Sequence, residues 1–541
     1  MNKQQNNNII ELNISGTLDS EGRGVGRFDG RVVFVGKTIP GEAVLARMTK
    51  DKKNYAEAEL LEVKMPSLSR IKPACPHFGS CGGCALLHMD YSEQLRQKQA
   101  MVESALQRIG GFKDIKIENI SPAKRQYYYR NRIQLQVQKK DGSWQLGFFY
   151  LGSHKVCQFA ECLLLPAVFN EITNFLRYKC SMYFPDGLRQ IVLQANNNLS
   201  EISVGFVGDG EADKIIKTAA KLIDTYEQIK QIYLNFTGKT YVLWGAEKLH
   251  DNIGGLDFYI SPGAFVQVNS DERETMLAHI IKSAALTGKE QIFDIYCGSG
   301  AISLPLAAQL TNLSAKSTEQ GVSTGRAIGV ESYAAAVEAA KYNAAANGID
   351  NAEFFCGKAE EILPSLVGLN ADLSNNTELE SDINNRGKIN SLNKSFLTIL
   401  TPDVIILDPP RAGCAEQVLK TCLQLAPKKI IMVSCNPATL ARDIKYLMSG
   451  AKNADLSVRL LAKDTINTDG GKLADTMQLP AYTIQSVLPF DMFPQTPNVE
   501  TVCLLSKLNA KQHIEINLDM DELDLTDAEK KATYQEIKDY V

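Results

Sequence analysis

The stretch FDIYCGSG, residues 293–300, ends a short apolar run and leads into a helical pattern. Glycines at such a turn let the backbone approach a ligand at the carboxyl end of a strand. Strand patterns recur here and onward along the chain, at 291–296, 327–331, 352–355, 403–407 and 429–434, with helical patterns at 334–347 and 414–425. This alternation predicts an α/β, Rossmann-like domain with a mostly parallel sheet and helices on both faces.

The ends of the predicted strands suggest what the domain binds. The glycine turn alone fits a dinucleotide and S-adenosylmethionine equally well, and it lacks the Gly-Lys-Ser/Thr of a phosphate loop. The next strand ends in Glu331, where an acidic residue typically binds ribose hydroxyls. A later strand ends in Leu-Asp-Pro-Pro-Arg, residues 407–411, which resembles the Asp/Asn-Pro-Pro-aromatic loop of amino- and base-methyltransferases. Arg411 replaces the aromatic residue, so these residues favour S-adenosylmethionine and a nucleobase target other than an exocyclic amine.

Two later residues could carry the chemistry. Cys435 follows the strand at 429–434, so its thiol should point into the ligand crevice at the carboxyl edge of the sheet. A thiolate that adds to carbon 6 of uracil gives carbon 5 enolate character, and the adduct must then lose its carbon-5 proton to a base. Glu500 follows an apolar, Pro-rich stretch in which a carboxylate can act as that base. The alternatives are a small buried cysteine and a solvated glutamate.

The front of the chain differs in pattern and in charge. Short apolar runs alternate with Gly-rich turns over residues 11–63, which predicts a small β-barrel. An amphipathic helix is predicted over 90–110, followed by mixed strands and helices to about residue 255. Residues 1–150 carry 23 Lys+Arg against 15 Asp+Glu, whereas residues 515–541 carry 3 against 9. A basic front end suggests a polyanionic partner, and ordinary surface variation is the alternative.

Three cysteines cluster as Cys75-x5-Cys81-x2-Cys84, with glycines between the last two. This spacing is typical of a metal site, and a fourth ligand would come from Cys157 or Cys162. Four thiolates suit zinc or an iron–sulfur cluster, and spacing alone does not separate the two. Polar stretches at 311–325, 369–394 and 465–471 are predicted to be surface insertions.

Several motifs, taken together and in order, resemble the RNA 5-methyluridine methyltransferase family, and most of all the bacterial 23S ribosomal RNA uracil-C5 enzymes. They include Asp-Pro-Pro-Arg (408–411), Ser-Cys-Asn-Pro (434–437), Phe-Pro…Val-Glu (493–500), Tyr-Arg-Asn-Arg (129–132) and Ser-Pro-Gly-Ala-Phe-Val-Gln-Val-Asn (261–269). The resemblance covers essentially the whole chain. Relatives usually have His where this chain has Gln495 and Asn498, and many have Lys in place of Ala412.

The resemblance implies roles for particular residues. Cys435 would be the nucleophile and Glu500 the proton acceptor. S-adenosylmethionine would contact Gln267, Tyr296, Glu331 and Asp408. A [4Fe-4S] cluster would bind Cys75, Cys81, Cys84 and Cys162, and the front barrel would be a TRAM (OB-like) RNA-binding domain. The implied domains are the TRAM-like barrel (1–64), a central α+β domain with the cluster cysteines (65–260) and the methyltransferase domain with the acidic tail (261–541).

The sequence thus predicts an S-adenosylmethionine-dependent enzyme that methylates carbon 5 of a uridine in 23S ribosomal RNA. The alternatives are a transfer RNA uridine methyltransferase and a non-catalytic RNA-binding protein on the same scaffold. We expect a cytoplasmic monomer without DNA or membrane partners, because no secretory signal and no long apolar run is present. Arg130 and Arg132 are candidate phosphate contacts, beside tyrosines that could stack on bases.

Overall fold

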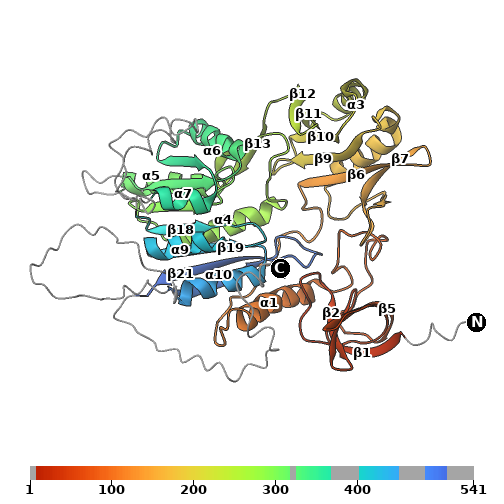
Figure 1. The fold of residues 1–541 in the computed structure, drawn as a ribbon. Helices are drawn as coiled ribbons and strands as arrows, with labels where there is room; N and C mark the ends of the chain where they lie inside the picture. Colours follow the sequence, from red (N-terminus) through yellow and green to blue (C-terminus); the bar gives the residue numbers. More distant parts are fainter. Residues whose placement is uncertain (1–7, 317–323, 367–400, 450–481, 509–541) are drawn as a thin grey trace, which may run out of the picture. The chain divides into compact units, whose positions relative to one another are not determined.

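The structure, a computed structural model, describes residues 8–316, 324–366, 401–449 and 482–508. The described residues up to Ile280, together with Cys435–Pro437 and Val487–Val502, form one compact unit, and the other described residues form a second. Figure 1 shows their helices and strands, many of them labelled. No described helix is both long enough and apolar enough to cross a bilayer.

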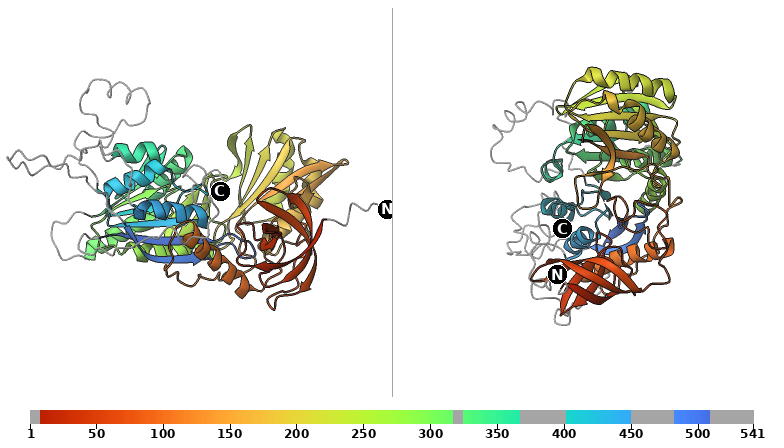
Figure 2. Two further views of the ribbon diagram at one scale, coloured as in Figure 1. Left: turned by 60° about the horizontal axis from the view of Figure 1, so that its bottom comes forward. Right: turned by 90° about the vertical axis from the view of Figure 1, so that its right-hand side faces the viewer.

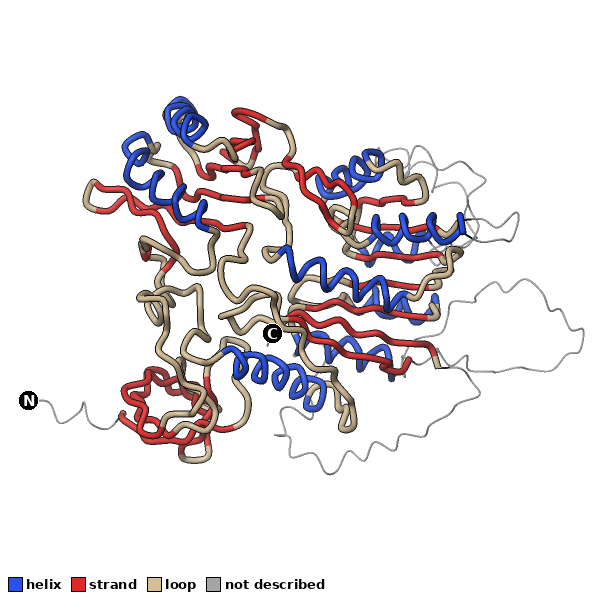
Figure 3. Tube along the Cα trace, turned by 180° about the vertical axis from the view of Figure 1, so that it is seen from behind, coloured by secondary structure: helices blue, strands red, loops and turns tan. Residues whose placement is uncertain are grey.

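The first unit begins with a closed five-stranded barrel, as predicted, which Figure 3 views from one end. Its strands are β1 (Ile9–Ser15), β2 (Gly24–Phe28), β3 (Arg31–Val35), β4 (Ala43–Asp51) and β5 (Tyr55–Met65), closed in the order β1-β2-β3-β5-β4. Alternate residues of β1 point inward, so Ile10, Leu12 and Ile14 enter the core. Gly24 and Gly26 lie within β2 and not in a turn. A Cβ at Gly26 would lie 2.2 Å from Cδ1 of Leu12, so a larger residue at this position would have to displace that core side chain.

Helix α1 (Tyr91–Arg108) confirms the helix predicted over 90–110. Asp90 caps it, accepting a hydrogen bond of 2.8 Å from the backbone N–H of Glu93. The apolar residues Val102 and Leu106 are buried as expected, but so are polar residues one and two turns earlier, among them Gln94 and Lys98. α1 lies alongside the segment 487–502 of the same unit, as both views of Figure 2 show in orange and blue.

A seven-stranded sheet forms the middle of the first unit. Its order is β12-β11-β10-β9-β6-β7-β8. The strands are β6 (Arg132–Lys140), β7 (Ser143–Phe149), β8 (Val156–Cys157), β9 (Leu188–Ala195), β10 (Ile202–Gly208), β11 (Ile229–Phe236) and β12 (Lys239–Gly245). Helices α2 (Ala167–Phe175) and α3 (Ala212–Thr225) bury Phe169 and Leu222 in the same apolar core. This is the predicted α+β architecture. The hairpin β13 (Leu249–Ile253)–β14 (Leu256–Ile260) and helix α4 (Ser270–Ala284) follow.

The second unit contains the predicted α/β fold. Its sheet has the order β17-β16-β15-β18-β19-β21-β20, and the neighbours from β17 to β19 pair in parallel. The strands are β15 (Gln291–Ile295), β16 (Arg326–Glu331), β17 (Ala352–Cys356), β18 (Val404–Leu407), β19 (Lys429–Ser434), β20 (Tyr482–Phe490) and β21 (Glu500–Lys507). Residues 487–490 of β20 and 500–502 of β21 are counted with the first unit. The helices are α5 (Ser303–Lys316), α6 (Ala334–Ala346), α7 (Ala359–Leu366), α9 (Glu416–Leu425) and α10 (Pro437–Ser449).

One predicted insertion needs correction. Residues Thr311–Lys316 continue helix α5 and are not an irregular loop. Leu310 is buried on this helix, and the Ser314 hydroxyl donates a hydrogen bond of 2.6 Å to the Gly288 carbonyl, which holds the last turn. The predicted insertions at 369–394 and 465–471 lie outside the described residues, as does the acidic tail.

Candidate functional site

Two strand ends of the second unit are joined by Glu331. Its Oε2 accepts a hydrogen bond of 3.2 Å from the backbone N–H of Gly298, in the turn after β15. Its Oε1 accepts one of 2.8 Å from the N–H of Tyr333, at the start of α6. In the same turn Tyr296 has a φ of 71°, and Gly298 has a φ of 55°. This left-handed backbone turns the chain sharply where β15 ends, so the predicted residues Tyr296 and Glu331 lie at one edge of the sheet.

Two carboxyls lie on adjacent strands beside that turn. Asp294, in β15, is completely buried, and its Oδ2 accepts a hydrogen bond from the Ser303 hydroxyl. Its Oδ1 has no hydrogen-bond partner among the described residues. Asp408 follows β18, the parallel neighbour of β15. Burial raises the pKa of Asp294 to about 7, and burial followed by the charge of Asp294 raises the pKa of Asp408 to about 7. A cationic group placed beside these carboxyls would favour their ionised forms.

The loop after Asp408 is held by helix α10. The Asp443 carboxylate accepts a hydrogen bond of 2.8 Å from the backbone N–H of Cys414, and Arg442 donates one of 3.1 Å to the Ala412 carbonyl. Arg442 and Asp443 are both buried and paired with each other. Gly413 has a φ of 78°, and a Cβ there would lie 2.3 Å from Nη2 of Arg442. This network fixes the Pro-Pro loop, and sequence reasoning missed it.

Three of the predicted residues belong to the first unit. Cys435 is the residue after β19 and is half-buried. Glu500 begins β21 with only 5% of its surface exposed. Gln267 lies between β14 and α4 and is half-buried. The structure therefore brings Tyr296, Glu331 and Asp408 together within the second unit, whereas these three residues belong to the first.

The segment that leads to Glu500 is tied to helix α1 through buried polar groups. Lys98, completely buried, forms an ion pair with Asp491, and the Tyr91 hydroxyl donates a hydrogen bond of 2.8 Å to the same carboxylate. The side chains of Gln94 and Gln495 are joined by a hydrogen bond of 2.9 Å. Gln495 is thus an internal partner of α1 at a position where the resembled family usually has His. Sequence reasoning missed these residues, although positions 94 and 98 lie on the same helix face as the apolar Val102.

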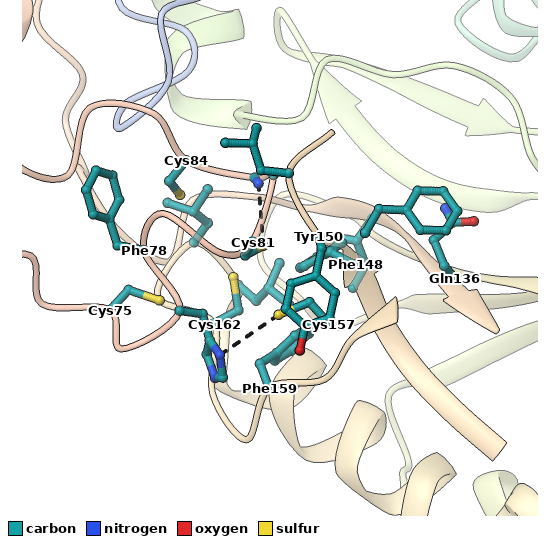
Figure 4. Close-up of a pocket in the computed structure, with 18 of the residues that line it drawn as sticks. Cys75, Phe78, Cys81, Cys84, Gln136, Phe148, Tyr150, Cys157, Phe159 and Cys162 are labelled. Carbon is teal, nitrogen blue, oxygen red and sulfur yellow. Dashed lines mark hydrogen bonds between the residues drawn. The ribbon is translucent and has the colours of Figure 1, made fainter. Parts of the chain in front are cut away.

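Five cysteines line one cavity of about 640 Å³ in the first unit, namely Cys75, Cys81, Cys84, Cys157 and Cys162. Figure 4 shows their side chains around it. Burial raises the pKa of Cys162 to about 11 and that of Cys84 further, and nearby cysteines contribute to both shifts. Cys157 is the most buried of the five, with its Sγ 3.9 Å from Nδ1 of His77. Among the described residues, no three His, Cys, Asp or Glu side chains converge closely enough to hold a single metal ion.

A parallel sheet with a glycine turn and acidic strand ends defines a Rossmann-like class of enzymes that bind nucleotide-type ligands at that edge. Comparison with known proteins identifies the family. A model described as tRNA (Uracil-5-)-methyltransferase matches residues 90–458, and a TRAM domain model matches residues 3–61. The chain belongs to this family of RNA uracil-5 methyltransferases, and its barrel is a TRAM domain, as the sequence predicted.

Relatives match the chain along nearly its whole length. An uncharacterized RNA methyltransferase of Halalkalibacterium halodurans is 32% identical over 94% of this chain and 100% of its own. Another, from Clostridium tetani, is 31% identical over 94% of this chain and 98% of its own. The fold is similar to that of the tRNA (uracil-54, C5)-methyltransferase of Pyrococcus abyssi, whose crystal structure contains S-adenosyl-L-homocysteine. That likeness has a TM-score of 0.61 and 23% identity, and covers 91% of this chain and 99% of the other.

Proposed function

We propose that the protein transfers a methyl group from S-adenosylmethionine to carbon 5 of a uridine in RNA, with Cys435 as nucleophile and Glu500 as base. The observation that carries the proposal is the position of Cys435 directly after β19. β18, the parallel neighbour of β19, ends in the braced Asp-Pro-Pro loop. Ligands of open α/β sheets bind at the carboxyl ends of such strands.

Each step of the reaction has a residue for it. The Cys435 thiolate adds to carbon 6 of the uracil, and the electron pair displaced onto the ring makes carbon 5 nucleophilic. Carbon 5 takes the methyl group of the sulfonium and releases S-adenosylhomocysteine. Glu500 then removes the proton from carbon 5, and the returning electron pair breaks the bond between carbon 6 and sulfur. The thiolate is regenerated, and the proton is left on Glu500.

The second unit offers groups that suit the methyl donor. S-adenosylmethionine carries positive charge on its sulfonium and its ammonium group. The pKa values of the Asp294 and Asp408 carboxyls are raised to about 7, so a cation beside them would stabilise their ionised forms. Oδ1 of Asp294 has no hydrogen-bond partner among the described residues. We assign Asp408, Tyr296, Glu331 and, from the first unit, Gln267 as contacts for this ligand.

For the RNA substrate we favour 23S ribosomal RNA. The basic first 150 residues and the TRAM domain support an RNA partner held by electrostatic contacts. The second candidate is transfer RNA, because the matching family model is named for it and the Pyrococcus abyssi enzyme acts on uracil 54 of tRNA. A base inside a helix must be flipped out for attack at carbon 6, so both substrates require an exposed uridine. We expect the enzyme to act in the cytoplasm as a monomer.

The cysteine cavity suits a [4Fe-4S] cluster held by Cys75, Cys81, Cys84 and Cys162. In such a cluster each thiolate binds a different iron, so the sulfurs must surround a cavity and need not converge on one point. Burial, followed by the charges of neighbouring cysteines, raises the pKa values of Cys84 and Cys162, and a cationic centre would favour their thiolate forms. Cys157 is the alternative fourth ligand. Anaerobically purified protein should be brown and contain iron and sulfide in equal amounts, whereas a colourless protein loaded with zinc would refute the cluster.

The function is tested by incubating the purified protein with S-adenosylmethionine and transcripts of 23S ribosomal RNA or transfer RNA. Nucleosides are then analysed by mass spectrometry. We expect 5-methyluridine in the ribosomal transcript and none with Cys435→Ala, which should still bind S-adenosylmethionine. Methylation of the transfer RNA alone would select the second candidate. Methylation at another atom or base, or by Cys435→Ala at the normal rate, would refute the proposal.

A further inference from the structure

We propose that helix α1 and the turn after Cys84 position Glu500, by holding the segment Asp491–Gln495 that leads to it. This inference rests on the proposed role of Glu500 as the base. The segment 491–495 is here called the brace loop, and all the contacts that hold it lie within the first unit.

The backbone carbonyls of the brace loop are bound one after another by different parts of the first unit. Asn269 Nδ2 donates a hydrogen bond of 3.2 Å to Met492 O, Lys98 Nζ one of 3.0 Å to Phe493 O, and the Tyr129 hydroxyl one of 3.0 Å to Pro494 O. The backbone N–H groups of Ala85 and Leu86 both donate hydrogen bonds of 3.1 Å to Gln495 O. Four successive carbonyls thus have partners from four places: helix α1, the turn after Cys84 (here called the cysteine turn), the segment before β6 that contains Tyr129, and the residue before α4.

The side chains at the two ends of the brace loop are also fixed. The buried ion pair between Lys98 and Asp491 is joined by the Tyr91 hydroxyl, which in turn accepts a hydrogen bond of 2.7 Å from the N–H of Ala123. At the other end, Gln495 has a left-handed φ of 70°. Its N–H donates a hydrogen bond of 3.1 Å to Oε1 of Gln94, and its Oε1 accepts one from Nε2 of Gln94. Buried polar groups of this kind specify one conformation, because each alternative leaves several of them unpaired.

This fixation matters because a base must stand within hydrogen-bond reach of the proton that it removes. Glu500 follows the brace loop by five residues and is itself buried, so displacement of the loop would displace its carboxylate. A misplacement of about 1 Å at a reacting group can lower a rate roughly 100-fold. Gln94, Lys98 and Tyr129 are therefore positioning residues. They act through the backbone before Glu500 and are not assigned contact with the reacting atoms.

The turn after Cys84 also has a structural role in holding the brace loop. Ala85 and Leu86 directly follow Cys84, and both bind the carbonyl of Gln495. Whatever orders Cys84 also orders these two N–H groups. The cavity that holds the cysteines and the loop that leads to the base are thus neighbours in one hydrogen-bonded network.

Two pairs of variants test the inference. Tyr129→Phe removes the hydroxyl that donates to Pro494 O, whereas Tyr482→Phe removes a buried hydroxyl of the second unit that donates to Pro427 O at 2.8 Å. Gln94→Leu breaks two bonds to Gln495. Its matched control, Gln97→Leu, lies on the same helix, is equally buried, and binds Leu18 and Glu93 instead.

The readouts separate positioning from a loss of stability. Proton removal follows carbon–carbon bond formation, so a misplaced base should leave methylated RNA bound to Cys435. We expect Tyr129→Phe and Gln94→Leu to accumulate this adduct, to lower kcat roughly 10- to 100-fold with little change in KM, and to speed hydrogen exchange in residues 487–502. Tyr482→Phe and Gln97→Leu should show none of these effects, even if each control unfolds at the same denaturant concentration as the brace-loop variant with which it is paired.

A Glu500→Gln variant completes the experiment. If it accumulates adduct but each brace-loop variant behaves like its control, the positioning role is wrong and the base assignment stands. If Glu500→Gln turns over normally without adduct, the assignment of the base itself is wrong. Hydrogen exchange reports on the brace loop in either case, and equal exchange in a variant and its control would overturn the inference.

Discussion

At the scale of single residues, burial determines the charge state of the groups beside the glycine turn. Asp294 lies in β15 and is completely buried, and Asp408 directly follows the parallel neighbour β18. Removal from water disfavours the ionised form of a carboxyl, which accounts for pKa values near 7 in place of 3.8. Burial thus favours the protonated forms of both carboxyls when no cation lies beside them.

This state predicts a pH dependence of stability. The unfolded chain releases the Asp294 proton near pH 3.8, and the folded chain keeps it to about pH 7. Between these values the folded state binds more protons, so the free energy of unfolding falls as pH rises. Asp294→Asn has no carboxyl to ionise, so its free energy of unfolding should not fall in this way. It should exceed that of the parent by up to about 4 kcal/mol at pH 8, with little difference at pH 4. Urea titrations at both pH values measure this, and an equal difference at both would contradict it.

Lys98 and Asp491 predict a second effect. Replacing Lys98 with Met leaves the Asp491 carboxylate buried without its cation and should cost about 3–5 kcal/mol of unfolding free energy. The double variant Lys98→Met/Asp491→Leu should recover much of that loss, because no unpaired charge is then buried. Chemical denaturation of the two single variants and the double variant measures the coupling. Additive losses would show that the pair is not coupled.

The sequence singled out candidate catalytic residues, but it did not single out the residues that support them. Cys435 and Glu500 stood out because a thiol after a strand and a carboxylate in an apolar stretch are unusual. Lys98 did not stand out, because a lysine in an amphipathic helix is normally solvated. Its burial is tolerated only because it pairs with Asp491, which lies nearly 400 residues later in the chain. Asp294 was quoted within the glycine turn, but its burial depends on packing that no local pattern contains.

At the scale of elements, the five parallel strands β15 to β19 were predicted to within one residue at each end, because each is a short apolar run next to helical patterns, whereas β20 and β21 were not predicted. The structure has Lys429–Ser434 as predicted and Val404–Leu407 one residue shorter. The end of α5 was wrong, because Thr311–Lys316 is polar and yet is held by a tertiary contact to Gly288. Tertiary contacts of this kind override local polarity.

The loop between β18 and α9 gives a prediction at this scale. Gly413 and Gly30 share a φ of 78°, but a Cβ at Gly413 would collide with Arg442 and Asp443, whereas Gly30 has open space. Both Ala variants should lose about 1 kcal/mol or more from the left-handed backbone. Gly413→Ala should lose more, and it alone should weaken S-adenosylmethionine binding by displacing the loop after Asp408. Calorimetric titration of both variants checks this, and equal affinities would contradict the bracing role of Arg442 and Asp443.

At the scale of the whole molecule, the barrel is joined to the rest of the first unit by buried side-chain contacts as well as by the chain itself. Arg70, which follows the last barrel strand, donates a hydrogen bond of 2.7 Å to the completely buried carboxylate of Glu42 in the barrel. The N–H of Leu18 binds Gln97 of α1, and Leu18 packs with Leu86 and Met89. Local sequence patterns predicted the barrel and the helix separately, but these long-range contacts between them follow from the tertiary fold alone.

The docking of the barrel predicts cooperative unfolding. In differential scanning calorimetry the barrel should melt together with the rest of the first unit. Arg70→Met leaves Glu42 buried without its cation, so a separate transition at lower temperature should appear. Arg31→Met, which removes an ion pair with the exposed Asp51 on the outside of the barrel, should leave the transition unchanged. A single unshifted transition in Arg70→Met would mean that the barrel is held by other contacts.

The central claim is that Cys435 attacks the uracil and Glu500 completes the reaction, and one measurement tests it most directly. Glu500→Gln is incubated with RNA substrate and S-adenosylmethionine, denatured, digested with protease and nuclease, and analysed by mass spectrometry. The account predicts a methylated uridine nucleotide attached to the peptide that contains Cys435, and no such product when Cys435→Ala is combined with Glu500→Gln. Full methylation without any covalent peptide, or attachment at another cysteine, would contradict it.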